Sequence, residues 1–352
     1  MSMNKMASSH GVNSNMAQKK VNKKAVIGRL LSYLKDYKWQ LALVGLAIIV
    51  SAVAGVAGSL FLKVLIDDFI TPLIGQVSPS FAKLSSVILF MGGIYLLGVV
   101  GTYAYNRLMT SVSQSGLDKI RRDMFAKMQK LPLSYFDTNA HGDIMSKYTN
   151  DIDTLRELLS QVLPQVFSTI VTLALVFSAM VATSWELTIL VIASVVLMLV
   201  VIAYLAKKSG KYYLAQQNSL GEVNGYIEEM MNGQKVVKVF CHEEKTKEGF
   251  DELNQKLAKN SAAANGIASI FMPVMNNLGN VQYVLIALVG GMLAINGVGG
   301  GHITLGVIAA FLQLSKSFTN PIIQVAQQLN FLVMAFAGAD RIFEMMDEKP
   351  EQ

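Results

Sequence analysis

The sequence of 352 residues is poor in charge and has a single cysteine. Charged side chains make up 15% of it, whereas soluble domains carry about 25%. A soluble fold needs charge to cover its surface, so the deficit argues against two or three soluble domains. Cys241 alone excludes an intrachain disulfide and a four-cysteine metal site. The four histidines are far apart in the chain, and we expect no metal site.

Apolar residues, by contrast, make up 52% of the chain and occur in long runs, and the mean hydropathy is +0.42. Six runs are long enough to cross a hydrocarbon core, which takes about 20 residues. They are residues 39–66, 85–109, 162–182, 187–206, 271–296 and 304–324. The sequence therefore predicts an all-α integral membrane protein with six transmembrane helices.

Lysine and arginine are distributed unevenly around these spans. Lys63 and Lys83 fall on one side, and all the others belong to the N-terminal tail, the inner end of span two, the two long inner segments or the chain from Lys316 onward. Because positive charge stays cytoplasmic, both termini are predicted to lie inside the cell. The expected location is the plasma membrane.

The inner segments, residues 110–161 and 207–270, contain few glycine or proline breakers. Half of such a segment, if helical, reaches about 35–45 Å beyond the membrane. Spans two to five are therefore expected to continue into the cytoplasm as paired helices closed by short turns. Residues 26–38 have the amphipathic pattern of a helix in the inner interface, and residues 1–25 are expected to be disordered.

Several short motifs carry a more specific signal, because they occur in a fixed order on this topology. In chain order they are Tyr135-Phe136-Asp137, Gly142-Asp143, Ser146-Lys147, Asn150-Asp151, Glu229, Gly233, Val236-Val237-Lys238, Phe240, Glu243-Glu244, Leu305-Gly306, Ala309-Ala310-Phe311, Pro321 and Asp340-Arg341-Ile342-Phe343-Glu344. Over about residues 26–349 the chain resembles the transmembrane domain of type I ATP-binding-cassette (ABC) exporters, in detail the multidrug and lipid type of Gram-positive bacteria. Lys147 stands where that family usually has arginine.

The resemblance implies a domain-swapped dimer of six-helix units, residues 26–346 here, with residues 347–352 starting a linker to a nucleotide-binding domain. It also implies that a short helix at the tip of each inner loop docks on an ATPase domain, which closes around ATP and Mg²⁺ and tilts the long helices. The docking residues carried over to this sequence are Phe136, Asp137, His141, Gly142, Asp143, Phe240, His242, Glu243 and Glu244. The two phenylalanines would supply apolar contacts and the others polar ones. From the residues alone, each tip could also be a solvated corner between helices.

No GxxxxGK[ST] phosphate loop occurs in the sequence, and the glycine cluster at residues 297–301 lacks the lysine and hydroxyl residue of that motif. The chain is therefore not expected to be an enzyme by itself, and ATP with Mg²⁺ is expected on an ATPase domain. It is either a truncated half, which the linker-like ending favours, or a permease subunit with a separate ATPase chain. The run Cys241-His242-Glu243-Glu244 lacks the second histidine of HExxH and is not expected to bind metal or to be catalytic.

Polar residues recur at helical spacing within spans five and six. Polar side chains facing lipid are costly, so such stripes usually face the bundle interior or water. One interpretation is hydrogen bonding between helices, and the other, which we favour, is the wall of a substrate pathway. The predicted pathway residues are Met272, Asn276, Asn280, Tyr283, Gln313, Lys316, Ser317, Asn320 and Gln324. A third stripe, Gln161, Gln165, Ser168 and Thr172, enters span three.

The sequence and the resemblance together predict the membrane part of an ATP-driven exporter of hydrophobic or amphipathic small molecules, with no nucleic-acid partner. A lipid flippase, a lipid-linked flippase and a peptide exporter of the same fold are alternatives. An ion-coupled secondary transporter is a remote one, because the six spans contain no Asp or Glu to carry a coupling ion. A receptor or channel that used the stalks for docking would bind no ATPase domain.

Overall fold

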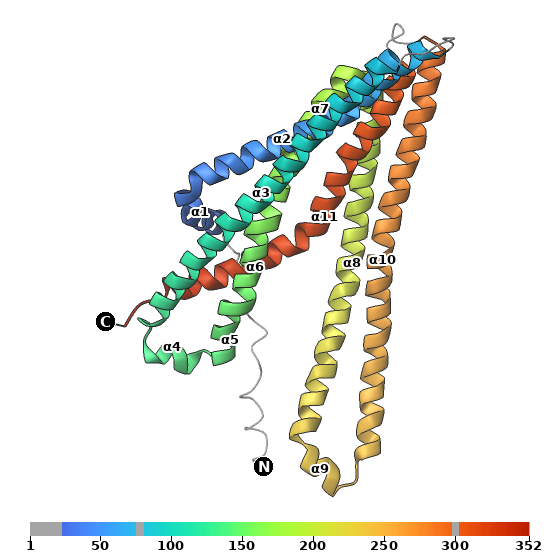
Figure 1. Cartoon of the computed structure of the whole chain (residues 1–352). Coiled ribbons are helices and arrows are strands. Elements are labelled where there is room, and N and C mark those ends of the chain that lie inside the picture. The colour runs from blue at the N-terminus through green and yellow to red at the C-terminus, as the bar shows by residue number, and fades with distance from the viewer. Residues whose placement is uncertain (1–22, 75–80, 298–302, 352) are drawn as a thin grey trace. The chain divides into compact units, whose positions relative to one another are not determined.

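The computed structural model describes residues 23–74, 81–297 and 303–351 (Figure 1). Nearly all of these residues are helical and none of them forms a β-strand, so the predicted all-α fold is confirmed. In chain order the α-helices are α1 (Lys23–Leu34), α2 (Lys38–Val64), α3 (Ala82–Met128), α4 (Leu133–Thr138), α5 (His141–Ser146), α6 (Ile152–Glu157), α7 (Leu163–Thr183), α8 (Trp185–Asn232), α9 (Gln234–Val239), α10 (Glu243–Ile295) and α11 (Leu305–Asp347).

The predicted spans lie within helices except for their end residues Asn296 and Thr304. Five helical stretches are long and apolar enough to cross a membrane, namely Val26–Leu73, Ala82–Met128, His141–Thr183, Trp185–Asn232 and Glu243–Ile295. The sixth span lies in α11, a continuous helix that carries the polar residues Gln313, Lys316 and Asn320. The predicted tail, residues 1–25, lies almost wholly outside the described residues, as does most of the glycine cluster at 297–301.

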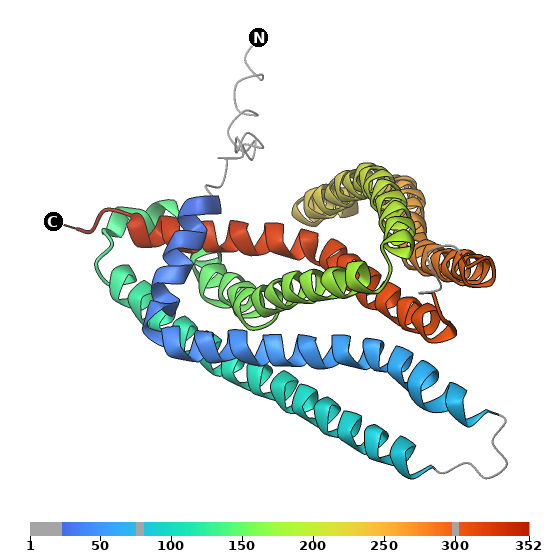
Figure 2. The same ribbon diagram turned by 90° about the horizontal axis from the view of Figure 1, so that it is seen from above.

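The chain divides into two units, of which the first comprises residues 1–54, 94–171 and 327–352. Its core is formed by buried apolar side chains from α1, α3, α6 and the end of α11, among them Leu30, Leu117, Ile120, Leu155 and Ile342. The amphipathic pattern of α1 places one face on this core, and α1 crosses the C-terminal part of α11 (Figure 2). A helix of this length is marginally stable by itself in water, so α1 depends on the burial of this face for its stability.

Small residues bring α2 and α3 close together within the first unit. A Cβ added to Gly98 would lie 2.8 Å from the Cβ of Ala54, and one added to Gly101 would lie 3.0 Å from a backbone oxygen of α2. The hydroxyls of Ser51 and Thr102 are 2.7 Å apart across the same contact. Glycine is therefore required at both positions for this close approach, as is common between membrane helices.

The second unit comprises residues 55–93 and 172–326. Buried side chains from α7, α8, α10 and α11 form its core, including Val176, Val191, Ile286, Phe311 and Leu314. Beyond this core α8 and α10 continue side by side as an antiparallel hairpin, with α9 at the turn between them (Figures 1 and 2). The expected pair of long helices closed by a short turn is present.

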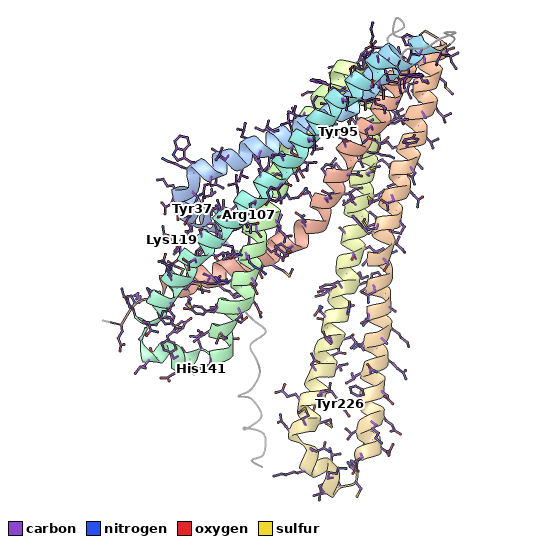
Figure 3. The ribbon with its side chains drawn as sticks, viewed as in Figure 1. Tyr37, Tyr95, Arg107, Lys119, His141 and Tyr226 are labelled. Atoms are coloured by element: carbon purple, nitrogen blue, oxygen red, sulfur yellow. The ribbon has the colours of Figure 1, made fainter. Side chains whose placement is uncertain are left out.

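Contacts between α8 and α10 become polar toward the tip of this hairpin. The side chain of Asn260 donates to the Ser219 hydroxyl at 2.7 Å, and Lys256 forms an exposed ion pair with Glu222 at 2.6 Å. Nearer the tip, Tyr226 on α8 faces α10 (Figure 3) and donates its hydroxyl proton to the Thr246 carbonyl at 2.9 Å. The hairpin is thus held by side-chain hydrogen bonds where a large apolar core is lacking.

Candidate functional site

Spans five and six line an open cavity of about 350 Å³ between α10 and α11, inside the second unit. The lining residues are Met275, Asn276, Gly279, Asn280, Gln282, Ser315, Lys316, Thr319, Asn320 and Ile323. Four of the predicted pathway residues, Asn276, Asn280, Lys316 and Asn320, are among them. The two polar stripes read from the sequence therefore meet at one cavity, which is what a pathway wall requires.

Lys316 is the charged residue of this cavity. It lies about 17 Å along the helix axis from Leu305, so if predicted span six begins at the membrane surface, Lys316 is near the middle of a hydrocarbon core about 30 Å thick. Its ammonium nitrogen lies 5.1 Å from the centre of the Tyr283 ring, within the range of a cation–π interaction. A charge facing lipid at this depth would cost about 3 kcal/mol or more, so its position on a cavity indicates a hydrated space.

Gln282 supplies a buried amide to the same cavity. Its side-chain oxygen accepts a hydrogen bond from the Thr319 hydroxyl at 3.2 Å, while its amide nitrogen has no hydrogen-bond partner among the described residues. Only 2% of Gln282 is exposed, and a buried donor without a partner costs about 1–3 kcal/mol. The wall of the cavity therefore contains an amide donor that has no partner in the described part of the chain.

Sequence reasoning missed Gln282 and Thr319. A signal for Thr319 was present, because it follows Lys316 by three residues and so lies on the predicted face of α11. Gln282 is two residues from Asn280 and next to Tyr283, outside the three-residue and four-residue steps of the predicted stripe, so the helical spacing gave no signal for it.

The remaining predicted pathway residues do not line this cavity. The ring of Tyr283 lies beside Lys316, which does line the cavity. The other four, which lie on α10 or α11 outside the cavity wall, are Met272, Gln313, Ser317 and Gln324. Met272 and Gln313 are exposed on their helices. The contribution of these four residues to substrate binding stays a prediction.

The third polar stripe lines a separate cavity of about 530 Å³ in the first unit. Its wall includes the predicted Gln161 and Gln165, together with residues that the sequence pattern did not single out: Tyr105, Asn106, Thr110, Gln114, Arg156, Ser160, Pro164 and Gln328. The signal for three of these was a four-residue repeat of polar side chains on α3 at positions 106, 110 and 114. That repeat extends past residue 109, the end of the predicted span, so a search for polar stripes within the spans did not include it.

In the first inner loop, α4 carries Phe136 and Asp137, and α5 carries His141, Gly142 and Asp143. The last three are exposed, and His141 lies at the end of the loop (Figure 3). Phe136, predicted to supply apolar contacts to an ATPase domain, is partly buried against the core of the first unit and packs edge-on against Tyr135 with ring centres 5.7 Å apart. The exposed large apolar side chains of this loop are instead Leu133 and Met145.

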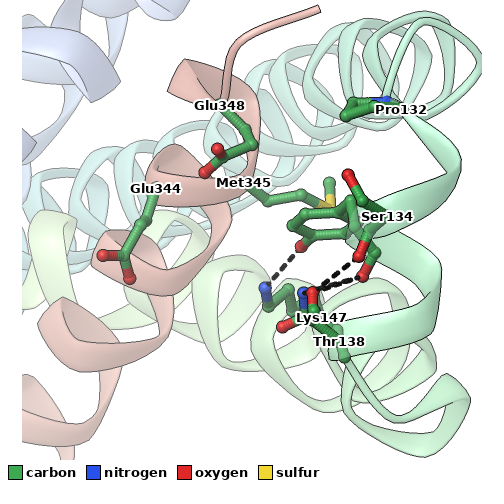
Figure 4. Close-up of a pocket in the computed structure, with 9 residues that line it drawn as sticks. Pro132, Ser134, Thr138, Lys147, Glu344, Met345 and Glu348 are labelled. Carbon is green, nitrogen blue, oxygen red and sulfur yellow. Dashed lines mark hydrogen bonds between the residues drawn. The ribbon is translucent and has the colours of Figure 1, made fainter. Parts of the chain in front are cut away.

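A cleft of about 490 Å³ separates this loop from the last turns of α11, as Figure 4 shows. On the loop side Lys147 donates to the Tyr135 hydroxyl at 3.1 Å. On the α11 side Glu344 and Glu348 line the cleft. The cleft is accordingly polar, with one cation and two carboxylates around it.

Above this cleft, an ion pair joins the first loop to α11. Both Nε and Nη2 of Arg341 donate to the Asp151 carboxylate, the former at 3.0 Å, and only 3% of Asp151 is exposed. These hydrogen bonds raise the pKa of Arg341 above its ordinary value. Gly338 makes room for the carboxylate, since a Cβ there would lie 3.2 Å from it. Two-point pairing of this kind fixes orientation as well as distance.

In the second inner loop, α9 exposes an apolar face. Val236, Val239 and Phe240 follow the helical spacing, and Val239 is 76% and Phe240 65% exposed. The chain then turns at Cys241, whose φ of 51° lies in the left-handed region, and α10 begins at Glu243.

The polar docking residues predicted for this loop surround that turn. His242 and Glu244 are exposed, and Glu243 is only partly covered. Lys238 donates to Glu243 at 3.0 Å, and this hydrogen bond lowers the pKa of the Glu243 carboxyl. Within the described residues no group of histidine, cysteine and carboxylate side chains could hold a metal ion.

Comparison with known proteins identifies the family of this chain. The sequence profile of the ABC transporter transmembrane region matches residues 38–322. The chain is 32% identical over 329 residues to the uncharacterized ABC transporter ATP-binding protein YfiC of Bacillus subtilis, a match that covers 94% of this chain and 53% of that protein.

Two further relatives have names that describe a substrate. The fatty acid ABC transporter ATP-binding/permease protein of Mycobacterium tuberculosis is 33% identical over 271 residues, which covers 77% of this chain and 42% of that protein. The ATP-dependent lipid A-core flippase of Haemophilus ducreyi is 26% identical over 328 residues, covering 92% and 54%. The chain spans about half the length of these relatives. By its helices and by the profile that covers most of it, the chain is a membrane protein that belongs to the family of ABC transporter transmembrane regions.

Proposed function

We propose that this chain is the substrate-translocating part of an ATP-driven exporter, which works as a dimer in the plasma membrane and moves hydrophobic or amphipathic small molecules outward. Both termini would lie in the cytoplasm. The partner would be an ABC ATPase domain that binds ATP and Mg²⁺, on the same polypeptide or as a separate chain. The names of the relatives, which describe ATP-binding proteins, support such a partner.

The observation that carries the proposal is the exposed apolar face of Val236, Val239 and Phe240 on α9. It lies about 40 Å along α8 from the end of the predicted span, too far for lipid to cover it. An exposed apolar patch of this kind marks a protein-binding surface. The surrounding His242, Glu243 and Glu244 would form the polar rim of that contact.

A single helix joins this surface to the cavity. α10 begins at Glu243 beside the tip and continues as one helix, with Pro273 inside it, past Asn276 and Asn280 in the cavity wall. Because a helix transmits a displacement of one end to the other, movement of an ATPase domain at the tip would shift one wall of the cavity against α11. The proposed alternation between inward-facing and outward-facing states follows from this lever.

Transport by inside-out membrane vesicles tests the proposal. The chain would be produced together with its ABC ATPase domain, and ATP with Mg²⁺ is expected to drive uptake of amphipathic probes. Burial of a phenylalanine contributes about 1.5–3 kcal/mol, so Phe240→Ala should weaken docking by about tenfold or more. Both this variant and the charge reversal Glu243→Lys should uncouple ATP turnover from transport.

A matched control is Leu214→Ala, which truncates an exposed apolar residue on α8 away from the tip. It should leave coupling intact. If Phe240→Ala and Glu243→Lys transport as well as the unaltered protein, the tip is not the coupling surface.

The single cysteine offers a direct view of the movement, since Cys241 is exposed at the tip. A spin label on Cys241 should report one distance between the two copies in a dimer without nucleotide, and a shorter one when ATP is bound and hydrolysis is blocked. A distance that ATP does not change would contradict the lever, and the absence of any coupling between labels would contradict the dimer.

A further inference from the structure

We infer that the α10–α11 cavity binds the anionic headgroup, a carboxylate or a phosphate, of an amphipathic substrate, with Lys316 as its charge partner. This inference rests on the proposed export function and narrows its substrate class. It is carried by the charge, the hydrogen-bond donors and the apolar wall of one cavity.

The charge of the cavity has one sign. The six predicted spans contain no Asp or Glu, and no carboxylate of the described residues lies within ion-pair distance of Lys316. The contact that Lys316 does make, with the Tyr283 ring, supplies no hydrogen-bond acceptor for the ammonium protons. An ionisable residue at this depth normally has a partner, and the cavity leaves that role to an anion.

The hydrogen-bond donors agree with the charge. The amide nitrogen of Gln282 is buried and has no partner in the described part of the chain, although the oxygen of the same amide is bonded to Thr319. Asn276, Asn280 and Asn320 add further amides to the wall. An ionised carboxylate or phosphate accepts hydrogen bonds, so either suits a wall that offers an ammonium group and amide donors, whereas a cationic headgroup would face the like charge of Lys316.

The remaining wall suits the start of an alkyl chain. Met275, which is fully buried, and Ile323 line the same cavity as Lys316. A volume of about 350 Å³ is at the small end of ligand pockets, about 300–1,000 Å³. It accommodates a headgroup and the first methylene groups of a lipid, and the rest of the chain would extend beyond it. The assigned substrate is therefore an anionic amphiphile.

Binding to the chain itself tests this without any ATPase activity. Native mass spectrometry of the chain released from uncharged detergent micelles would measure occupancy by oleate, by lysophosphatidate and by dodecyltrimethylammonium at equal concentrations. We expect the two anions to bind and the cation to bind at least about tenfold more weakly. Acetate and inorganic phosphate, tested as competitors, distinguish recognition of the whole amphiphile from capture of a free anion.

Four variants identify the groups responsible. Lys316→Gln should lower the affinity for both anionic probes by about tenfold or more, and Lys316→Arg should restore most of it. Gln282→Leu should lower it severalfold. Lys63→Gln, which removes a span lysine that does not line the cavity, should bind like the unaltered chain. Equal binding of the anions by Lys316→Gln and the unaltered chain, or preferential binding of the cation, would overturn the assignment.

The outcomes separate this inference from the function on which it rests. If ATP drives export of neutral or cationic compounds while neither anion binds, the headgroup site is wrong and the export function stands. If the anions bind through Lys316 but ATP drives export of no probe, the site stands and the export function is wrong.

Discussion

The two inner loops are built from the same kinds of element but are held in different ways. The first, at α4 and α5, rests on the apolar core of the first unit, and Asp151 ties its continuation to Arg341 on α11. The backbone N–H of Glu351 also donates to the Lys130 carbonyl at 2.8 Å. The second, at α9, is carried only by the pairing of α8 with α10, whose tip half is joined largely by side-chain hydrogen bonds.

This difference suggests different mechanical roles. A loop that packs on a core and shares a buried ion pair with α11 can move only together with α11. A hairpin with few buried apolar contacts opens locally at low free energy, so its tip can adapt to a partner while the long helices remain intact. We interpret the first loop as the rigid contact to an ATPase domain and the second as the adaptable one.

The largest expected effect comes from breaking the buried tie of the first loop. Arg341→Ala leaves the Asp151 carboxylate buried without its partner. Loss of one member of a buried pair costs about 3–5 kcal/mol, and because the arginine side is partly exposed we expect about 2–4 kcal/mol. The unfolding midpoint of the chain in detergent should fall by several degrees, and the double variant with Asp151→Asn should recover part of the loss.

The matched control is the ion pair of the hairpin. Lys256→Ala removes the exposed partner of Glu222, and exposed pairs contribute about 0–1 kcal/mol. A cost for Lys256→Ala as large as that for Arg341→Ala would show that the two loops are held alike.

A smaller effect is expected from the buried hydrogen bond between α8 and α10. Asn260→Ala leaves the Ser219 hydroxyl buried without its donor, at a cost of about 1–2 kcal/mol. Because the hairpin opens locally, amide hydrogen exchange should accelerate around residues 215–225 and 255–265, with little change in the core of the first unit.

Gln255→Ala provides the comparison for that variant, since Gln255 is exposed on the same helix and should leave exchange rates unaltered. If Asn260→Ala accelerates exchange in both units equally, the hairpin is not an independent cooperative segment.

How far the sequence predicted these features depends on whether they are local. The helices and the polar stripes follow from hydrophobic runs and helical spacing, so Asn276, Asn280, Lys316 and Asn320 could be placed on two inward faces from their spacing alone. Periodicity within one helix identifies the residues that share a face, and this was sufficient to predict these four residues of the cavity wall.

Contacts between distant segments could not be predicted in the same way. Asp151 and Arg341 both belong to motifs noted in the sequence, yet nothing in either motif shows that the two side chains meet. Similarly, Asp67 accepts hydrogen bonds from the Thr304 hydroxyl and the Gly306 N–H at the start of α11, a pairing across more than two hundred residues. Likewise, nothing in the sequence around Phe136 shows that its side chain packs against the core of the first unit.

The smallest expected effect is a pH dependence of the order at the tip of the second loop. The Lys238 ammonium lowers the pKa of Glu243 in the folded hairpin, so this contact stabilises the tip above the ordinary glutamate pKa of about 4.3. The stabilisation is lost as the pH falls through the lowered value, because the protonated carboxyl no longer attracts Lys238. A spin label on Cys241, between the two partners, should become more mobile in that acidic range.

The pH midpoint of this change in mobility should respond to the contact. Lys238→Gln should shift that midpoint upward toward the ordinary glutamate value, and added salt should do the same by screening. Glu244→Gln, which removes the neighbouring pair with Lys247, should leave the midpoint in place. If Lys238→Gln leaves the midpoint unchanged, this contact does not order the tip, and the spin label should then be equally mobile at every pH.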